Sequence, residues 1–151
     1  MAEWTSQNPD FEKRVRASYG QQRMMASIGA TLAHVGPGEV DIVLPFRDDL
    51  TQQHGFMHAG IITAIADTAC GYAALSLMPT GTGVLSVEYK VNLMNPARGV
   101  RFIARGRVTK PGRTLTICLG EVFAQEGEQE TLVAIMLATM MAIRDRPSVV
   151  D

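Results

Sequence analysis

A chain of 151 residues with 46% apolar and 19% charged side chains has the size and balance of one globular domain, which excludes an intrinsically disordered protein. Its 14 Lys and Arg against 15 Asp and Glu give a net charge of −1, which argues against a dedicated DNA- or RNA-binding protein. The two cysteines, Cys70 and Cys118, lie in apolar stretches, so we expect buried free thiols and a cytoplasmic location. The polar N-terminus predicts no secretory signal, and the longest apolar stretch, residues 131–143, is too short to span a bilayer.

The first third of the chain predicts a helical segment followed by a β-hairpin. Within residues 8–28, apolar side chains recur at helical spacing, with Gly20 as a candidate break. Residues 31–36 and 39–45 flank a Gly-Pro-Gly turn and predict the two arms of a hairpin. The polar stretch that follows, residues 46–57, predicts an irregular loop.

The rest of the chain predicts one buried helix and four strands. Residues 59–77 are rich in Ala and apolar almost all round, which indicates a helix buried on most sides. The expected strands cover residues 84–94, 100–108, 114–123 and 131–143. This order predicts an α+β fold in which a largely antiparallel sheet, together with a second subunit, covers one long helix.

The first of these four strands alternates between apolar and polar residues. Leu85, Val87 and Tyr89 are therefore expected on one face, and Ser86 and Glu88 on the other. This pattern predicts a half-buried strand.

Asp67 is the only charged residue between Asp49 and Glu88, and it lies in the middle of the apolar helix. Burial of a carboxylate costs several kcal/mol unless the group has good partners, and perturbed carboxylates concentrate at functional sites. We therefore expect Asp67 to belong to a site. The alternatives are a narrow solvent-exposed stripe on the helix or a structural hydrogen bond to backbone.

The segment HGFMHAG, residues 54–60, comes directly before this carboxylate-bearing helix. Small residues at a helix start, here Ala59 and Gly60, leave backbone N–H groups free to hold a carbonyl oxygen or a developing oxyanion. The alternative is that the segment has no catalytic role, with an ordinary loop glycine and His58 as a cap of the helix. Ala59 and Asp67 are eight residues apart, or about 12 Å along a helix, so one reacting group could touch both only across two antiparallel helices of a two-fold dimer.

His54 and His58 are four residues apart, a spacing that can place two metal ligands on one helical face. Gly55 between them favours a loop at His54, and no third ligand follows at a recognisable spacing, so we expect no metal site. The serine-nucleophile, dinucleotide-binding and Walker patterns are absent from the sequence, and neither cysteine has a polar, activating context.

Residues 89–120 carry basic side chains and no acidic one. A basic sheet edge in a nearly neutral protein suits a small polyanionic ligand, and the alternative is a solvated face paired with acids such as Glu126, Glu128 and Glu130. Lys110 and Arg113 flank a turn and are therefore better placed to reach phosphates than the strand arginines are.

Three stretches together resemble the PaaI-like branch of the hotdog-fold acyl-CoA thioesterases. They are HGFMHAGIITAIADTACGYA at residues 54–73, VLSVEYKVNLMNPAR at residues 84–98 and VTKPGRTLTICLGEVF at residues 108–123. The resemblance covers most of the chain, from about residue 40 to residue 143. It implies a hotdog fold, in which a long central helix is wrapped by an antiparallel sheet, and hydrolysis of an acyl-CoA thioester without a cofactor.

The resemblance also assigns roles by position. Asp67 falls on the family's catalytic carboxylate, and Ala59, with Gly60 beside it, on the backbone donor that polarises the thioester carbonyl. Gln52 stands where many relatives have an Asn that orients the attacking water, and Ser86 stands at an assisting Ser or Thr position. HAG replaces the family's HGG, which keeps the donor but adds a methyl group.

The substrate-binding residues expected from the motif and its surroundings are His54, His58, Phe56, Met57, Lys110 and Arg113, with Met78 as a further candidate for the acyl wall. Lys110 and Arg113 fall in the turn that often meets the nucleotide end of coenzyme A in this family.

We divide the chain into an N-terminal helical segment (1–30), a hotdog domain (31–146) and a C-terminal tail (147–151). The expected partners are an acyl-CoA substrate and further copies of the chain, as a homodimer that the site requires and a homotetramer as many relatives form; no nucleic acid or membrane is expected. Three alternatives remain open: a hotdog hydratase or dehydratase that uses His54 or His58, a non-catalytic acyl-CoA-binding module, and a structural interaction domain.

Overall fold

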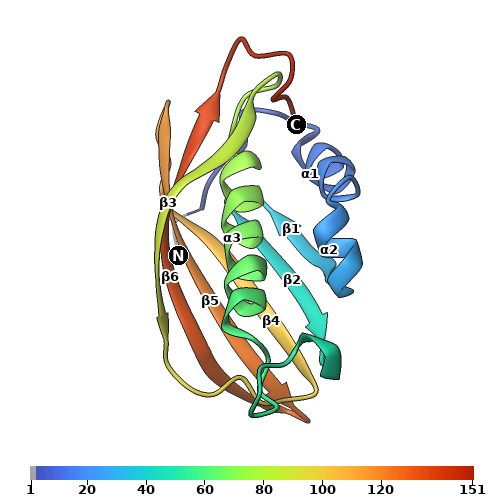
Figure 1. Ribbon diagram of the computed structural model, residues 1–151. Helices are drawn as coiled ribbons and strands as arrows, with labels where there is room; N and C mark the ends of the chain where they lie inside the picture. Colours follow the sequence, from blue (N-terminus) through green and yellow to red (C-terminus); the bar gives the residue numbers. More distant parts are fainter. Residues whose placement is uncertain (1–2) are drawn as a thin grey trace.

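The computed structural model describes residues 3–151 and begins with two short helices, α1 (Phe11–Tyr19) and α2 (Arg23–Ile28). The break at Gly20 confirms the interruption expected there. Val15 and Met25 are fully buried and anchor the two helices to the core. Both helices lie beside the long helix, on the side away from strand β3 (Figure 1).

A single antiparallel sheet of six strands forms the second layer, in the order β1-β2-β4-β5-β6-β3. Its strands are β1 (Thr31–Gly36), β2 (Glu39–Pro45), β3 (Gly83–Leu93), β4 (Arg101–Lys110), β5 (Leu115–Glu126) and β6 (Gln129–Ile143). β1 and β2 form the expected hairpin, with Gly36 opposite Glu39. A one-turn 3-10 helix, Asp48–Leu50, follows β2.

The long helix α3 (Ala59–Leu75) lies in the concave face of the curved sheet (Figure 1). It packs most closely on β4 and β5, where two glycines allow the approach. A Cβ atom on Gly106 would lie 2.4 Å from the carbonyl carbon of Ala69, and one on Gly120 would lie 2.9 Å from Cys70 Sγ. Both cysteines are buried and free, as expected. The helix wrapped by an antiparallel sheet confirms the predicted α+β arrangement.

Strand β3 differs from the prediction in which side chains face the helix. A bulge between Ser86 and Glu88 breaks the alternation, so Ser86 pairs with the buried Met140, and Tyr89 pairs with the buried Ala138. Cross-strand partners share a face of the sheet. Ser86 therefore lies on the helix side, and the expected common face of Leu85, Val87 and Tyr89 is wrong because the extra residue reverses the parity.

β3 is also more exposed than a half-buried strand. It is an edge strand of the single chain, and its apolar side chains Leu85, Val87 and Tyr89 are 45–49% exposed. An eleven-residue edge with apolar side chains is a surface that proteins normally cover.

The last residues of the chain fold back onto the helical layer. The Asp151 carboxylate accepts hydrogen bonds from Ser18 Oγ at 2.7 Å and from the Val84 backbone N–H at 2.9 Å. Residues 147–151 are thereby tied to α1 and β3. Within residues 3–151, no helix has the length and apolar character needed to cross a membrane.

Candidate active site

The start of α3 is held by a short, hydrogen-bonded loop. The Met57 N–H donates to the Ala97 carbonyl at 3.0 Å, and the His58 N–H donates to the Leu50 carbonyl at 3.0 Å. Gln52 closes the loop, because its Oε1 accepts from the backbone N–H groups of His54 and Phe56 at 2.5 and 3.3 Å. Gln52 thus orders the segment that leads into the helix.

His58 caps the helix. Its backbone is extended and its Nδ1 accepts from the Gly60 N–H at 2.8 Å, so that donor is occupied. For the Ala59 N–H, no acceptor is found among the described residues. Ala59 is exposed at the positive end of the helix dipole, which favours an oxygen that carries partial negative charge. The structure therefore offers the Ala59 N–H, rather than that of Gly60, as the free donor.

A cavity of about 330 Å³ opens beside this donor. It brings together four predicted residues, Gln52, Phe56, Met57 and Ala59, with apolar side chains of α3, β3 and β6. The Arg98 guanidinium carbon lies over the Phe56 ring, 5.4 Å from its centre. His54 is exposed in the loop and is absent from the residues that line this cavity.

Asp67 lies two turns further along α3, on a stripe of half-buried residues that includes Ala64, Thr68 and Gly71. Its Oδ1 accepts a hydrogen bond from Ser86 Oγ at 2.6 Å. The structure thus supports a half-exposed stripe around Asp67, whereas the hydrogen-bond partner of the carboxylate is the side chain of Ser86 on the neighbouring strand and not a backbone group. The bulge in β3 is what turns Ser86 toward the carboxylate.

Asp67 and Ser86 share a polar cavity of about 110 Å³ with three residues that sequence reasoning missed, Gln22, Tyr72 and Asp151. Tyr72 accepts a hydrogen bond from Gln22 Nε2 at 3.3 Å, and its hydroxyl lies 3.1 Å from Ser18 Oγ. Burial raises the pKa of the Tyr72 phenol, so it stays neutral. No spacing pattern links these residues, because they come from the turn before α2, from α3 and from the end of the chain.

The arginines of the sheet are largely engaged. Arg105 forms a two-pronged pair with Glu130, at 2.8 and 2.9 Å, and Arg107 lies 2.7 Å from Asp41. This result supports the solvated, acid-paired alternative for the strand arginines. Lys110 ends β4 and is exposed.

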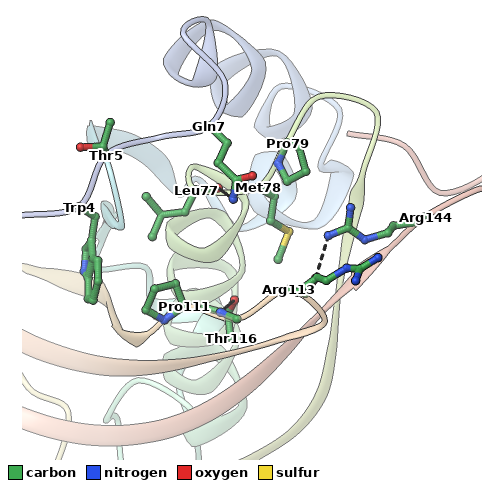
Figure 2. Close-up of a pocket in the computed structure, with 11 residues that line it drawn as sticks. Trp4, Thr5, Gln7, Leu77, Met78, Pro79, Pro111, Arg113, Thr116 and Arg144 are labelled. Carbon is green, nitrogen blue, oxygen red and sulfur yellow. Dashed lines mark hydrogen bonds between the residues drawn. The ribbon is translucent and has the colours of Figure 1, made fainter.

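Arg113 lies at the opposite end of α3 from Ala59. There it lines a third cavity, of about 500 Å³, together with Arg144, Trp4 and Met78 (Figure 2). Met78, predicted as an acyl wall, is thus placed far from the donor at Ala59. Within one chain the structure therefore separates the predicted site residues into three groups, at the start, the middle and the end of α3.

Burial makes both cysteines poor nucleophiles. It raises the pKa of the Cys118 thiol to about 12 and that of the Cys70 thiol well above its usual range. Across residues 3–151, no three His, Cys, Asp or Glu side chains are grouped in a way that could hold a metal ion. The expectation of a site without metal or cofactor stays a prediction.

Comparison with known proteins places this geometry in a family. Residues 54–131, half of the chain, match the model of the thioesterase superfamily. The solved structure of a thioesterase family protein from Silicibacter pomeroyi is 47% identical, with a TM-score of 0.87 over 89% of this chain and 98% of that chain. The Escherichia coli PaaI protein from the phenylacetic acid degradation operon is 19% identical, with a TM-score of 0.81 over 91% of this chain and 96% of that chain, and shows the shared fold.

Curated relatives are more distant. A protein from Saccharolobus solfataricus with a provisional esterase name is 27% identical over 85% of this chain and 83% of its own length. For a similarly named protein from Halobacterium salinarum, the match is 28% identical and covers 62% of this chain and only 65% of that protein. The family match, the 47% identical structure and the helix wrapped by an antiparallel sheet agree: the chain belongs to the thioesterase superfamily and has the hotdog fold.

Proposed function

We propose that this protein hydrolyses acyl-CoA thioesters to a free acid and coenzyme A, with Asp67 as the reacting carboxylate. The observation that carries the proposal is the 2.6 Å hydrogen bond from Ser86 to Asp67 inside a polar cavity on the long helix. It holds one carboxylate oxygen and leaves the other free to act on water or on the thioester. Membership of the thioesterase superfamily supports this reading.

The active unit is a two-fold dimer, and two features of the single chain support this. First, Ala59 and Asp67 are separated by about 12 Å of helix, which is too far for one thioester carbon to meet both. Second, the half-buried stripe around Asp67 adjoins the exposed apolar edge of β3, since Ser86 joins the two. A second copy packed there with its helix antiparallel would bring its Ala59 to this Asp67. Pairing of two dimers into a tetramer is a further part of the proposal.

The chemistry follows from these positions. The Ala59 N–H donates to the thioester carbonyl oxygen and stabilises the negative charge that develops there, while His58 keeps the helix start in place. In one route, Asp67 of the partner subunit takes a proton from the attacking water and passes it to the departing sulfur of coenzyme A. In the other, Asp67 attacks the carbonyl carbon and coenzyme A departs as the thiolate; water then hydrolyses the resulting anhydride, which releases the free acid, restores Asp67 and supplies the proton of the thiol. Ser86 orients the carboxylate in both routes. Gln52 holds the loop before α3 in place, and this loop positions the Ala59 N–H.

The cavity beside Ala59 would hold the acyl group or the adjoining thioester arm. Phe56 and Met57 supply its apolar wall on one side, and β3 and β6 supply the other. No metal or redox cofactor enters the proposal. His58 is engaged as a cap through Nδ1, so the hydratase alternative would have to use its other ring nitrogen, or the exposed ring of His54, as the acid or base.

The test is release of free thiol from phenylacetyl-, benzoyl-, hexanoyl-, decanoyl- and palmitoyl-CoA. Wild type should turn over at least one of them, and Asp67→Asn, which keeps size and fold, should lose about 100-fold or more. Circular dichroism checks folding. If no substrate releases thiol with folded wild type, or if Asp67→Asn retains full activity, the proposal is wrong. An assay of enoyl-CoA hydration then tests the lyase alternative.

A further inference from the structure

The last residues of the chain border the polar cavity that contains Asp67. The end of the chain lies beside α1, and Asp151 lines this cavity together with Ser86 (Figure 1). We propose that Asp151 is a positioning residue for the reaction: its carboxylate fixes the start of β3 and thereby holds Ser86 against Asp67. The effect on the rate rests on the proposed function, whereas the effect on β3 does not.

One oxygen of this carboxylate holds β3 directly. Asp151 Oδ2 accepts a hydrogen bond from the Val84 N–H at 2.9 Å, two residues before Ser86. β3 is an edge strand, and the bulge directly after Ser86 interrupts its pairing with β6. Exposed edge segments open more readily than the core of a sheet. The bond to Val84 thus secures the short stretch of β3 on which the contact between Ser86 and Asp67 depends.

The other oxygen ties the same carboxylate to α3. Asp151 Oδ1 accepts a hydrogen bond from Ser18 Oγ at 2.7 Å, and Ser18 Oγ lies 3.1 Å from the Tyr72 hydroxyl. A serine hydroxyl has a single proton, which Ser18 gives to the carboxylate, so Tyr72 donates to Ser18 and accepts in turn from Gln22 Nε2 at 3.3 Å. Tyr72 lies just over one turn after Asp67 on α3. The carboxylate therefore connects β3 to the helix that carries the reacting group.

Further contacts hold Asp151 in this place. Arg14 Nε donates to the Asp151 backbone carbonyl at 2.8 Å, and the same guanidinium donates to two carbonyl groups that follow α3, at 3.1 Å each. Burial lowers the pKa of Arg14, and the negative charge of Asp151 opposes this shift. Val149 packs on β3 so closely that a Cβ atom on Gly83 would collide with its carbonyl group. Asp151 is thus fixed through its backbone, its charge and a nearby residue of the tail, as a positioning role requires.

Asp151→Asn tests the effect on β3. The amide keeps the size of the side chain but has only one accepting oxygen, so it can serve Ser18 or Val84 and not both. Hydrogen-exchange mass spectrometry should show at least about five-fold faster exchange at residues 83–86 in the variant, with β5 unchanged. This measurement needs no turnover. The matched control is Asp145→Asn, an exposed acid whose left-handed backbone, with φ of 55°, suits Asn equally well, and it should exchange as wild type does.

Steady-state kinetics on the best substrate of the panel test the effect on the reaction. We expect Asp151→Asn to lower kcat about three- to ten-fold, no more than Ser86→Ala does, with KM within about two-fold of wild type. In the Ser86→Ala background, Asp151→Asn should cause no further loss, because Asp151 acts through Ser86. A purely structural role would instead lower the rate equally in both backgrounds. Ser18→Ala, which keeps the carboxylate but removes its link to α3, should show the same pattern in weaker form.

The outcomes separate this inference from the proposed function. If wild type releases no thiol, the proposed function is wrong, and the exchange at residues 83–86 alone decides whether Asp151 fixes the start of β3. The inference is overturned if exchange there is unchanged in folded Asp151→Asn, or if an active enzyme keeps its full kcat in that variant. It is also overturned if the losses of Asp151→Asn and Ser86→Ala add.

Discussion

The two sides of α3 obey different constraints. On the side that faces β4 and β5, Gly106 admits the helix backbone so closely that no larger residue fits, and Gly120 makes room for the Cys70 thiol. On the side that faces β3, the helix carries Asp67 among small residues that are only half-buried in one chain. Packing therefore determines residue type on the side that faces β4 and β5, called the inner side below. On the side that faces β3, called the outer side, the residues are those that the proposed reaction and a second subunit require.

The largest effect on the outer side is expected from Ala59→Pro. Proline removes the free N–H but suits the first position of a helix, and the extended backbone of His58, with ψ of 136°, is compatible with a following proline. We expect kcat to fall about 100- to 1000-fold, or about 2.7–4 kcal/mol, with little change in the melting temperature. Ala59→Gly keeps the donor and should stay active. Equal activity of the proline and glycine variants would show that this N–H has no catalytic role.

On the inner side, Gly106→Val should destabilise the fold by about 3 kcal/mol, since the new Cβ would collide with backbone atoms of Ala69 and Cys70 that cannot move aside. Urea unfolding measures the change. The matched control is Gly20→Ala, where the backbone is helical, with φ of −60°, and a Cβ meets only ordinary contacts at 3.4 Å or more. The control should be neutral or slightly stabilising. Similar losses in both variants would contradict the close-packing account.

Ser86→Ala tests the contact that links β3 to the reacting carboxylate. Loss of one hydrogen bond to a charged group should lower kcat about ten-fold, equivalent to about 1.4 kcal/mol. Ser86→Thr retains the hydroxyl and should recover most of the rate. Steady-state kinetics on the best substrate of the panel measure both variants. An unchanged kcat in Ser86→Ala would reduce the contact to a structural one.

The inner side also predicts a small loss of stability in alkali. Burial raises the pKa of Cys118 from 9.0 to about 12, so between these values the folded protein keeps a proton that the unfolded chain releases. This contribution to stability is complete below pH 9, and it falls as pH rises toward 12, by at most about 1.4 kcal/mol per pH unit. Urea unfolding at pH 8, 9 and 10 measures the slope. Cys118→Ala should have a shallower slope than wild type, and identical slopes would contradict this account.

Much of the fold follows from local sequence signals. The hairpin was predictable because a Gly-Pro-Gly turn separates two short strands, and α3 because an Ala-rich apolar stretch begins after a capping histidine and ends before a proline. Both signals act between residues that are close in the sequence, and the tertiary contacts of the fold do not override them. The central position of Asp67 was predictable for the same reason, since a lone carboxylate in such a helix stands out.

The parts that escaped prediction depend on contacts between distant residues. The bulge at Val87 arises where β3 pairs with β6, about 50 residues away, and the alternation within β3 alone indicates the opposite face for Ser86. Gln22, between α1 and α2, and Asp151, in the last residues, reach the cavity of Asp67 from positions far from it in the sequence. No motif spacing could connect them. The sequence did offer His58 as a helix cap. This reading excludes Gly60 as an oxyanion donor, because the cap occupies the Gly60 N–H.

The central claim is that one active site uses Ala59 of one subunit and Asp67 of its partner, and subunit mixing tests it most directly. Differently tagged Ala59→Pro and Asp67→Asn chains, each nearly inactive alone, are refolded together in equal amounts, and the tags confirm mixed dimers. Each mixed dimer would hold one intact site, and about half of all dimers would be mixed, so thiol release should return to about a quarter of the wild-type rate. No recovery in confirmed mixed dimers would contradict the shared site and place the reaction within a single chain.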